Sequence, residues 1–239
     1  MYLLNYLRPL QAFEEIHKAS TTITYILHQK ERLRLDPPHA QACYRAFWAC
    51  YLVEYELRPY VASSSLAISM MRGKVPLPHS DREEPGIFWF LSEIALRNLY
   101  ADVLTDVFFV PRSSHTIYAP IISEELNAQL ERWYLSLPPR MGFPRDSSLL
   151  PDPLAAFLRT QYYALLCMMK WPSMVRFLTD CPAEGLEDHA ALGDAALATE
   201  NAAIYIDSVE FLVHDRHILL PSLICGYATR LSLLSPVCL

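Results

Sequence analysis

Two aspartates with helical spacing are the residues of this chain that come nearest to a metal site. Asp102 and Asp106 lie four positions apart in an apolar segment, so a helix would place both carboxylates on one face. Such a pair can contact a divalent cation, although a Mg²⁺ site takes carboxylates together with substrate phosphates. No second aspartate-rich cluster in the sequence suits the opposite wall of such a site. We therefore interpret the pair as a solvated helix face and predict no metal ligand.

Three charged side chains, Glu54, Glu56 and Arg58, close a long apolar segment. Paired carboxylates can act as general acid and base, but a glycosidase pair must flank a sugar in a cleft, and the sequence indicates no cleft. We interpret the three residues as the end of a helix, where charges are paired or solvated. The sequence therefore predicts no catalytic residue, and we expect that the protein is not an enzyme.

Two histidines, His214 and His217, have the spacing i, i+3 at the expected end of another helix. A zinc site needs three or four ligands with hydrogen-bonding support, and none is evident. Histidine and Arg216 are also usual at a helix C-terminus, where the helix dipole favours positive charge. The six glycines form neither a phosphate-binding loop nor a G-x-S-x-G turn. We therefore expect no cofactor.

The cysteines have no spacing typical of zinc, because no pair forms a C-x2-C motif. The six are Cys43, Cys50, Cys167, Cys181, Cys225 and Cys238. Four of them fall in apolar stretches, where cysteine behaves as a small hydrophobic residue. The start of the chain has no evident signal peptide. We therefore expect reduced thiols in a protein that is not secreted.

The elements that would position these residues are helices. Residues 42–58 contain neither glycine nor proline and are apolar at nearly every position between 43 and 53, so we expect a central helix buried on most sides. Its aromatic residues, Phe47, Trp48, Tyr51 and Tyr55, could line a ligand pocket. We expect core packing instead, because aromatic side chains dominate protein cores.

Prolines divide the rest of the chain into further apolar segments with helical spacing. The pattern predicts one all-α domain of about seven helices. We expect them at residues 9–33, 43–57, 86–107, 123–135, 152–172, 186–213 and 218–233. Pro172 should stop or kink the fifth helix. The stretch 59–84 is polar and rich in proline, which indicates a long functional loop with one helical turn near residues 66–71.

The charge distribution argues against nucleic acid as a direct partner. The net charge is −6, and the first 180 residues carry 18 basic and 18 acidic side chains. The last 59 residues carry two arginines against eight acids. Nucleic-acid-binding proteins concentrate lysine and arginine on one face, and we therefore predict no direct, specific DNA binding. The apolar runs are also shorter than the roughly 20 residues that span a bilayer.

Several short segments of the chain are similar to sequence motifs of a known family and occur in the same order as in that family. Residues 8–20 (RPLQA followed by IHKAS) are similar to a helix that precedes its signature, and residues 45–57 (RAFWACYLVEYEL) to its aromatic helix ending in acidic residues. Residues 63–65 and 76–78 fall where it has a Pro-Ser-Ser-Gly-like turn and a Leu-Pro-Leu-Pro-like segment. Residues 130–138 match its helix ending in Trp and Leu-Pro. The chain thus resembles the regulatory middle homology region of fungal zinc-cluster (six-cysteine) transcription factors.

The resemblance implies that residues 1–239 form part of that regulatory domain. It implies a regulatory or effector module of a fungal transcription regulator in the nucleus, or otherwise in the cytoplasm. Its expected partners are other transcription proteins, a second copy of the chain and a small-molecule effector. The six-cysteine zinc module and the first helices of the region are missing, so we expect no zinc, and we expect exposed apolar surface and self-association.

One alternative comes from a different class of protein. All-helical metal-dependent enzymes of the prenyl-diphosphate type use aspartate-rich helices, and Asp102 and Asp106 would then carry the metal. Replacing both with asparagine would separate this alternative from the regulator, because only the enzyme would lose an activity.

Overall fold

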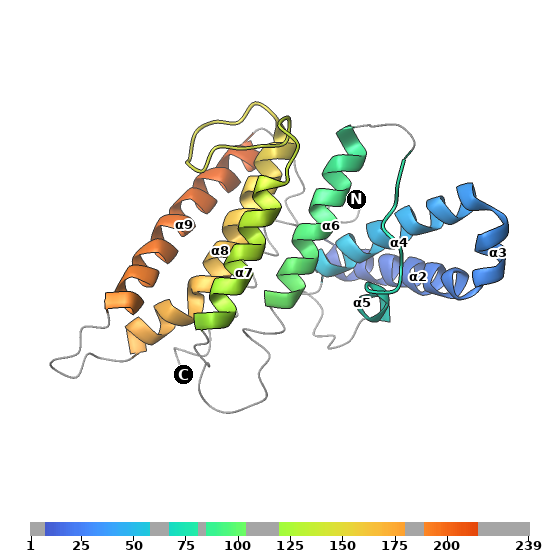
Figure 1. The fold of residues 1–239 in the computed structure, drawn as a ribbon, viewed down its shortest axis with the longest axis horizontal. Coiled ribbons are helices and arrows are strands. Elements are labelled where there is room, and N and C mark those ends of the chain that lie inside the picture. The colour runs from blue at the N-terminus through green and yellow to red at the C-terminus, as the bar shows by residue number, and fades with distance from the viewer. Residues whose placement is uncertain (1–7, 58–66, 81–84, 104–119, 180–188, 215–239) are drawn as a thin grey trace. The chain divides into compact units, whose positions relative to one another are not determined.

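The computed structural model describes residues 8–57, 67–80, 85–103, 120–179 and 189–214. All eight elements in these ranges are α-helices, which confirms the predicted all-α class (Figure 1). They are α2 (Pro9–His28), α3 (Lys30–Leu35), α4 (Pro37–Leu57), α5 (Ala67–Met71), α6 (Pro85–Val103), α7 (Pro120–Leu135), α8 (Pro153–Thr179) and α9 (His189–His214). The helix predicted at residues 218–233 lies outside the described residues.

The backbone contacts divide the chain into two compact units. The first includes residues up to Ile87 and therefore contains α2, α3, α4 and α5. The second, Phe88–Ile218, contains the rest of α6 together with α7, α8 and α9. Among the described residues, no helix is both long enough and apolar enough to span a membrane.

The segment predicted as one helix over residues 9–33 is two helices. Pro9 begins α2 as expected, because proline fits the first helical turn. The helix ends at His28, where Gln29 leaves helical geometry with a ψ of 58°. The amide of Gln29 donates to the carbonyl oxygen of Ile26 at 2.9 Å, and the chain then re-enters a helix at Lys30. No glycine or proline marks this break in the sequence.

The central helix α4 begins earlier than predicted. Pro37 and Pro38 do not close the segment in front of the helix but form its first turn, where a proline lacks an amide that would in any case be unpaired. The Oδ1 atom of Asp36 accepts a hydrogen bond from the amide of His39 at 3.1 Å. The Asp36 side chain therefore caps the helix.

Most of the α4 surface is buried, as predicted. Phe47, Trp48, Tyr51 and Tyr55 all lie in the core, where consecutive rings contact one another with centroids 5.3–5.7 Å apart. Beyond its exposed first turn, the helix exposes a stripe of Ala42, Arg45, Ala46 and Ala49, which recur at helical spacing. Small side chains expose little apolar area, so the stripe is compatible with water. The central helix packs against α2, α3 and α5.

The stretch after α5 runs along α4, held by two side chains of that helix. Trp48 donates from Nε1 to the carbonyl oxygen of Pro76 at 2.9 Å. Gln41 accepts a hydrogen bond from the amide of His79 at 3.0 Å. The predicted helical turn near residues 66–71 is confirmed as α5. The central helix thus fixes both the core and this neighbouring chain segment.

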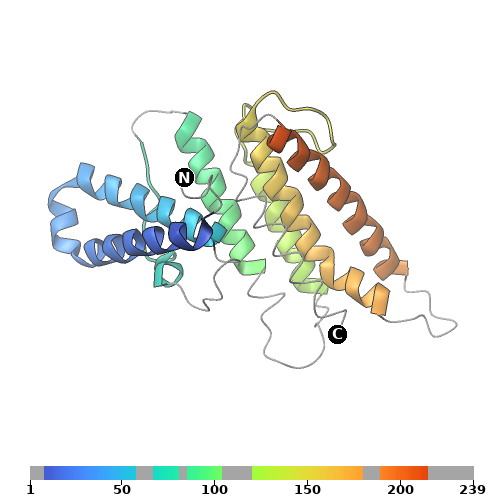
Figure 2. The same ribbon diagram turned by 180° about the vertical axis from the view of Figure 1, so that it is seen from behind.

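In the second unit, α8 lies along α9 and also contacts α7, as both ribbon views show (Figures 1 and 2). Asp152 caps α8 through a 3.0 Å hydrogen bond from the amide of Leu154 to Oδ1. The helix does not stop at Pro172 but continues to Thr179. Its axis bends toward that end in Figure 2, which is the kink that an internal proline produces.

Candidate functional site

A buried carboxylate joins α2 to α4 in the first unit. Glu54 is 1% exposed, and its Oε2 atom accepts a 2.6 Å hydrogen bond from the hydroxyl of Ser20. Its Oε1 atom lies 3.3 Å from Nδ1 of His17, whose side chain is half exposed. Of the two states expected at this helix end, paired or solvated, Glu54 is therefore paired, and it is buried. The cause is α2, which covers this part of α4.

Cys50 lies beside the same carboxylate, and its chemistry is that of a protonated thiol. Burial is the main cause that raises the pKa of the Cys50 thiol; a hydrogen bond with Ser20 lowers it by less, and the charge of the Glu54 carboxylate raises it by the smallest amount. A thiolate is the nucleophilic form of cysteine, so this environment opposes nucleophilic catalysis. Cys43, Cys50 and Cys167 are all buried free thiols, and the other three cysteines lie outside the described residues.

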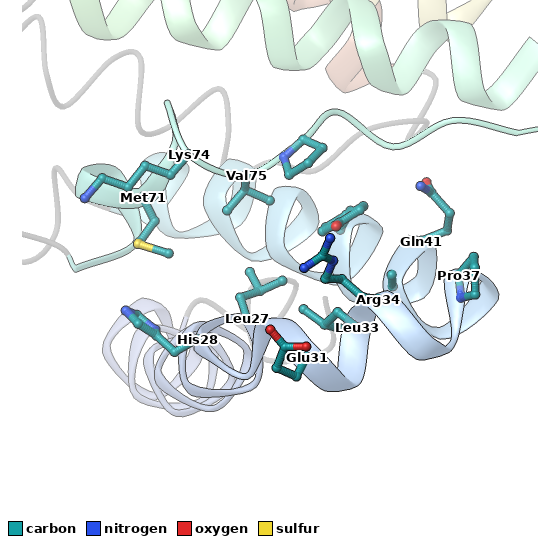
Figure 3. A pocket seen from close by; sticks show the side chains of 13 residues that line it. Leu27, His28, Glu31, Leu33, Arg34, Pro37, Gln41, Met71, Lys74 and Val75 are labelled. Carbon is teal, nitrogen blue, oxygen red and sulfur yellow. The ribbon is translucent and has the colours of Figure 1, made fainter.

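A cavity of about 780 Å³ opens near the turn between α2 and α3 (Figure 3). Its walls come from α2, α3, α4, α5 and the stretch that follows α5. The floor consists of buried apolar side chains, which are Leu27, Leu33, Ala40 and Val75. The volume lies within the range of about 300–1,000 Å³ that is typical of small-molecule sites.

Polar and charged side chains surround that floor. The polar lining residues are His28, Glu31, Arg34, Gln41, Tyr44 and Lys74. His28, Glu31, Arg34 and Lys74 are exposed, whereas Gln41 and Tyr44 are half-buried. Figure 3 shows Leu27, Leu33 and Val75 directed toward one another, with Arg34 directed into the same space. An apolar floor with a few polar groups at its edge can bind and orient a small amphipathic molecule.

None of the aromatic residues that could have lined a pocket contributes to this cavity. Phe47, Trp48, Tyr51 and Tyr55 are core residues, and the interpretation as packing is confirmed. The cavity instead uses Leu27, Arg34 and their neighbours, which the sequence did not single out. The one available signal was the charged run of residues 30–34, which follows the apolar spacing of the preceding helix.

The predicted metal and catalytic candidates are not brought together in the described parts of the chain. Asp102 is half-buried on α6, and Asp106 lies outside the described residues. The side chains of Glu56 and His214 are likewise not described, nor are Arg58 and His217. Within the described ranges, no group of three or more His, Cys, Asp or Glu side chains could hold a metal ion.

The second unit contains a buried contact between a glutamate and an arginine that the sequence did not reveal. Nη2 of Arg97 lies 3.0 Å from Oε1 of Glu93 one turn earlier on α6, and both side chains are buried. Burial raises the pKa of Glu93 to about 8, and the Arg97 guanidinium beside it opposes that rise. A perturbed carboxyl is a candidate for acid–base chemistry only when it faces a cleft, and no described cavity contains Glu93.

The motif at the end of α7 has a packing role. Trp133 stacks on Tyr162 and donates from Nε1 to the carbonyl oxygen of Ser92 on α6 at 2.9 Å. Tyr134 donates to the carbonyl oxygen of Phe143 at 2.6 Å, and the Arg145 guanidinium lies 4.2 Å from the centre of its ring. These residues tie α7 to α6, α8 and the following loop.

Comparison with known proteins finds a partial relative. The chain is 34% identical over 101 residues to a protein of Aspergillus rugulosus named "Putative transcription factor ecdB". The match covers 38% of this chain and 18% of that protein, so the chain spans about a fifth of its relative's length. No protein-family model matches the chain. No solved structure matches it either.

Proposed function

We propose that this chain is a regulatory module of a fungal transcription regulator that acts in the nucleus through partner proteins. The observation that carries the proposal is the 34% identity over 101 residues to a protein named as a transcription factor. The order of the family-like passages supports it. So does the structural role of two of them, because residues 45–57 lie in the central helix and residues 130–138 include the Trp133 packing centre.

The test joins the chain to a DNA-binding module that has no regulatory activity of its own. In a yeast strain with a reporter gene behind the cognate sites, we expect the fusion to change reporter output at least severalfold over the module alone. A fluorescent tag on the unfused chain should report nuclear accumulation. Unchanged output at equal protein level would contradict the proposal.

Two variants at one exposed position of α4 make the test specific for the folded module. Ala46→Pro places a proline within the central helix, which costs about 3 kcal/mol or more, and it should abolish the effect. Ala46→Ser changes the same solvent-facing position without breaking the helix and should retain it. An effect that survives Ala46→Pro would come from an unfolded segment and would overturn the proposal.

The alternative of a metal-dependent helical enzyme has no supporting observation. Its two residues, Asp102 and Asp106, would need further ligands, and no metal-binding group occurs among the residues that the structure describes. We therefore do not propose an enzymatic function.

A further inference from the structure

The cavity beside the α2–α3 turn has a shape and chemistry that the proposed regulatory function does not require. Its floor is formed by four buried apolar residues, so it can remove the apolar body of a ligand from water. Its residues come from segments as far apart as Leu27 and Pro76. The elements that carry the floor are held by the contacts of α4 with α2, α3 and α5, so the floor is present without a ligand.

The charges at the edge of the cavity favour a negative ligand. The lining contains two basic side chains, Arg34 and Lys74, whereas Glu31 is its one acid. Neither Arg34 nor Lys74 forms a salt bridge in the part of the chain that the structure describes. An excess of positive charge here contrasts with the net charge of −6 for the whole chain.

Arg34 is the better placed of the two cations. Figure 3 shows Arg34 directed into the space above Leu27 and Leu33, whereas Lys74 extends along the edge away from Arg34. The planar guanidinium can donate two parallel hydrogen bonds to a carboxylate or sulfonate, and such bonds are stronger than those between neutral groups. A ligand with its anionic group on Arg34 would lay its apolar part on the floor.

We propose that this cavity binds a small organic anion with an apolar body, held by Arg34 at its charged end and by Leu27, Leu33 and Val75 along its apolar part. Glu31 opposes the negative charge of the ligand and thereby limits affinity. The proposal stands on the cavity alone. Binding is measured on the unfused chain, so its failure is distinguishable from a failure of the reporter experiment.

Two fluorescent probes with the same aromatic body isolate the charge. 8-Anilinonaphthalene-1-sulfonate carries a sulfonate, and N-phenyl-1-naphthylamine is neutral. We expect the sulfonate to bind the folded chain more tightly than the neutral probe. Arg34→Gln should weaken sulfonate binding about tenfold, which is about 1.4 kcal/mol, and should leave the neutral probe unchanged.

Three further variants test the direction of each effect. Glu31→Gln should tighten sulfonate binding about two- to fivefold, which loss of structure could not do. Val75→Thr keeps the side-chain shape but places a hydroxyl on the floor, and it should weaken both probes. Arg45→Gln removes an exposed arginine of α4 that does not line the cavity, and it should change neither affinity.

The proposal is overturned if Arg34→Gln and Arg45→Gln have equal affinity for the sulfonate, or if Arg34→Gln weakens both probes alike. It is also overturned if Glu31→Gln weakens sulfonate binding. Far-ultraviolet circular dichroism on each variant shows that the helices are retained, and stoichiometry near one probe per chain separates the cavity from general adsorption.

Discussion

At the scale of single residues, the main energetic features are two buried carboxyl groups with different surroundings. Glu54 accepts a short hydrogen bond from Ser20 and lies near His17. Glu93 pairs with Arg97, and its second oxygen, Oε2, is buried without a hydrogen-bond partner in the described structure. Burying a carboxylate is costly unless it is paired and hydrogen-bonded. The two groups should therefore respond differently to mutation.

Removing the hydroxyl that donates a hydrogen bond to Glu54 should destabilise the first unit. Ser20→Ala leaves the buried Oε2 atom without its donor, which is expected to lower the free energy of unfolding by about 1–3 kcal/mol. Urea denaturation measures the change. Thr21→Ala at the exposed neighbouring position is the control and should stay within about 0.5 kcal/mol of wild type. Equal effects of the two substitutions would show that the Ser20–Glu54 bond contributes little.

Glu93 should make stability depend on pH. Burial raises its pKa from about 4.5 to about 8, so the folded chain holds a proton that the unfolded chain releases between these values. The contribution of protonated Glu93 to the stability of the fold is therefore fully present below pH 4.5 and is lost as the pH rises through 8. Relative to wild type, Glu93→Gln should become more stable by about 1 kcal/mol per pH unit across this window.

Denaturation of both proteins at several pH values between 5 and 8 measures this difference. Glu125→Gln is the control, because Glu125 is exposed and its pKa is lowered by hydrogen bonds from Gln129 and Arg132. That variant should keep a constant difference from wild type in this range. A difference for Glu93→Gln that is flat or has the opposite sign would mean that Arg97 keeps the carboxylate ionised.

At the scale of elements, one arginine holds the loop between α7 and α8. Arg159 on α8 is 1% exposed, and its Nη1 atom donates to the carbonyl oxygens of Asp146 at 3.0 Å and Ser148 at 2.6 Å. A loop without regular structure must satisfy its backbone groups in some other way. This side chain does so for two carbonyl groups at once, from a helix that is already fixed by its packing against α9.

Arg159→Met should therefore release the loop. It retains much of the side-chain length but removes both hydrogen bonds, and we expect a loss of about 2–3 kcal/mol in stability. Hydrogen exchange should show faster exchange of the Ser148 amide, while amides in the middle of α9 remain protected. Arg140→Gln, at an exposed position of the same loop, should leave the exchange unchanged. Protection of Ser148 that persists in Arg159→Met would contradict the assigned role.

At the scale of the whole molecule, charge decides which partners are accessible. The chain carries 20 basic and 26 acidic side chains, with the acidic excess in its last 59 residues. Binding of DNA depends on neutralising several phosphates and on presenting polar side chains to base edges. A local excess of positive charge lies at the cavity edge, where Arg34 and Lys74 accompany a single acid, Glu31. This suits a small anion better than a nucleic acid.

We expect that the isolated chain does not bind DNA specifically. A fluorescence-anisotropy titration at physiological salt should show no sequence-dependent binding at nanomolar chain. A role at a promoter would then depend on partner proteins or on a DNA-binding module joined to the chain. Sequence-dependent nanomolar binding that survives a zinc chelator would contradict this prediction.

The sequence by itself determined the features that depend on neighbouring residues. Helix starts at Pro9 and Pro153 follow from local backbone chemistry, because caps and first-turn prolines act within a few residues. The buried aromatic helix follows from its nearly continuous apolar character and its lack of glycine and proline. The all-α class follows from many such segments in succession, and it needed no knowledge of how they pack.

Only the tertiary structure decided the features that depend on distant partners. Glu54 is buried because Ser20 and His17, 34 and 37 positions away, reach it from α2. The break at Gln29 has no glycine or proline to mark it. The cavity lies beside that break, where α2, α3, α4 and the segment after α5 together enclose one apolar floor. The amino-acid composition is the same however the helices pack. Only their packing determines which charged and apolar side chains lie next to one another.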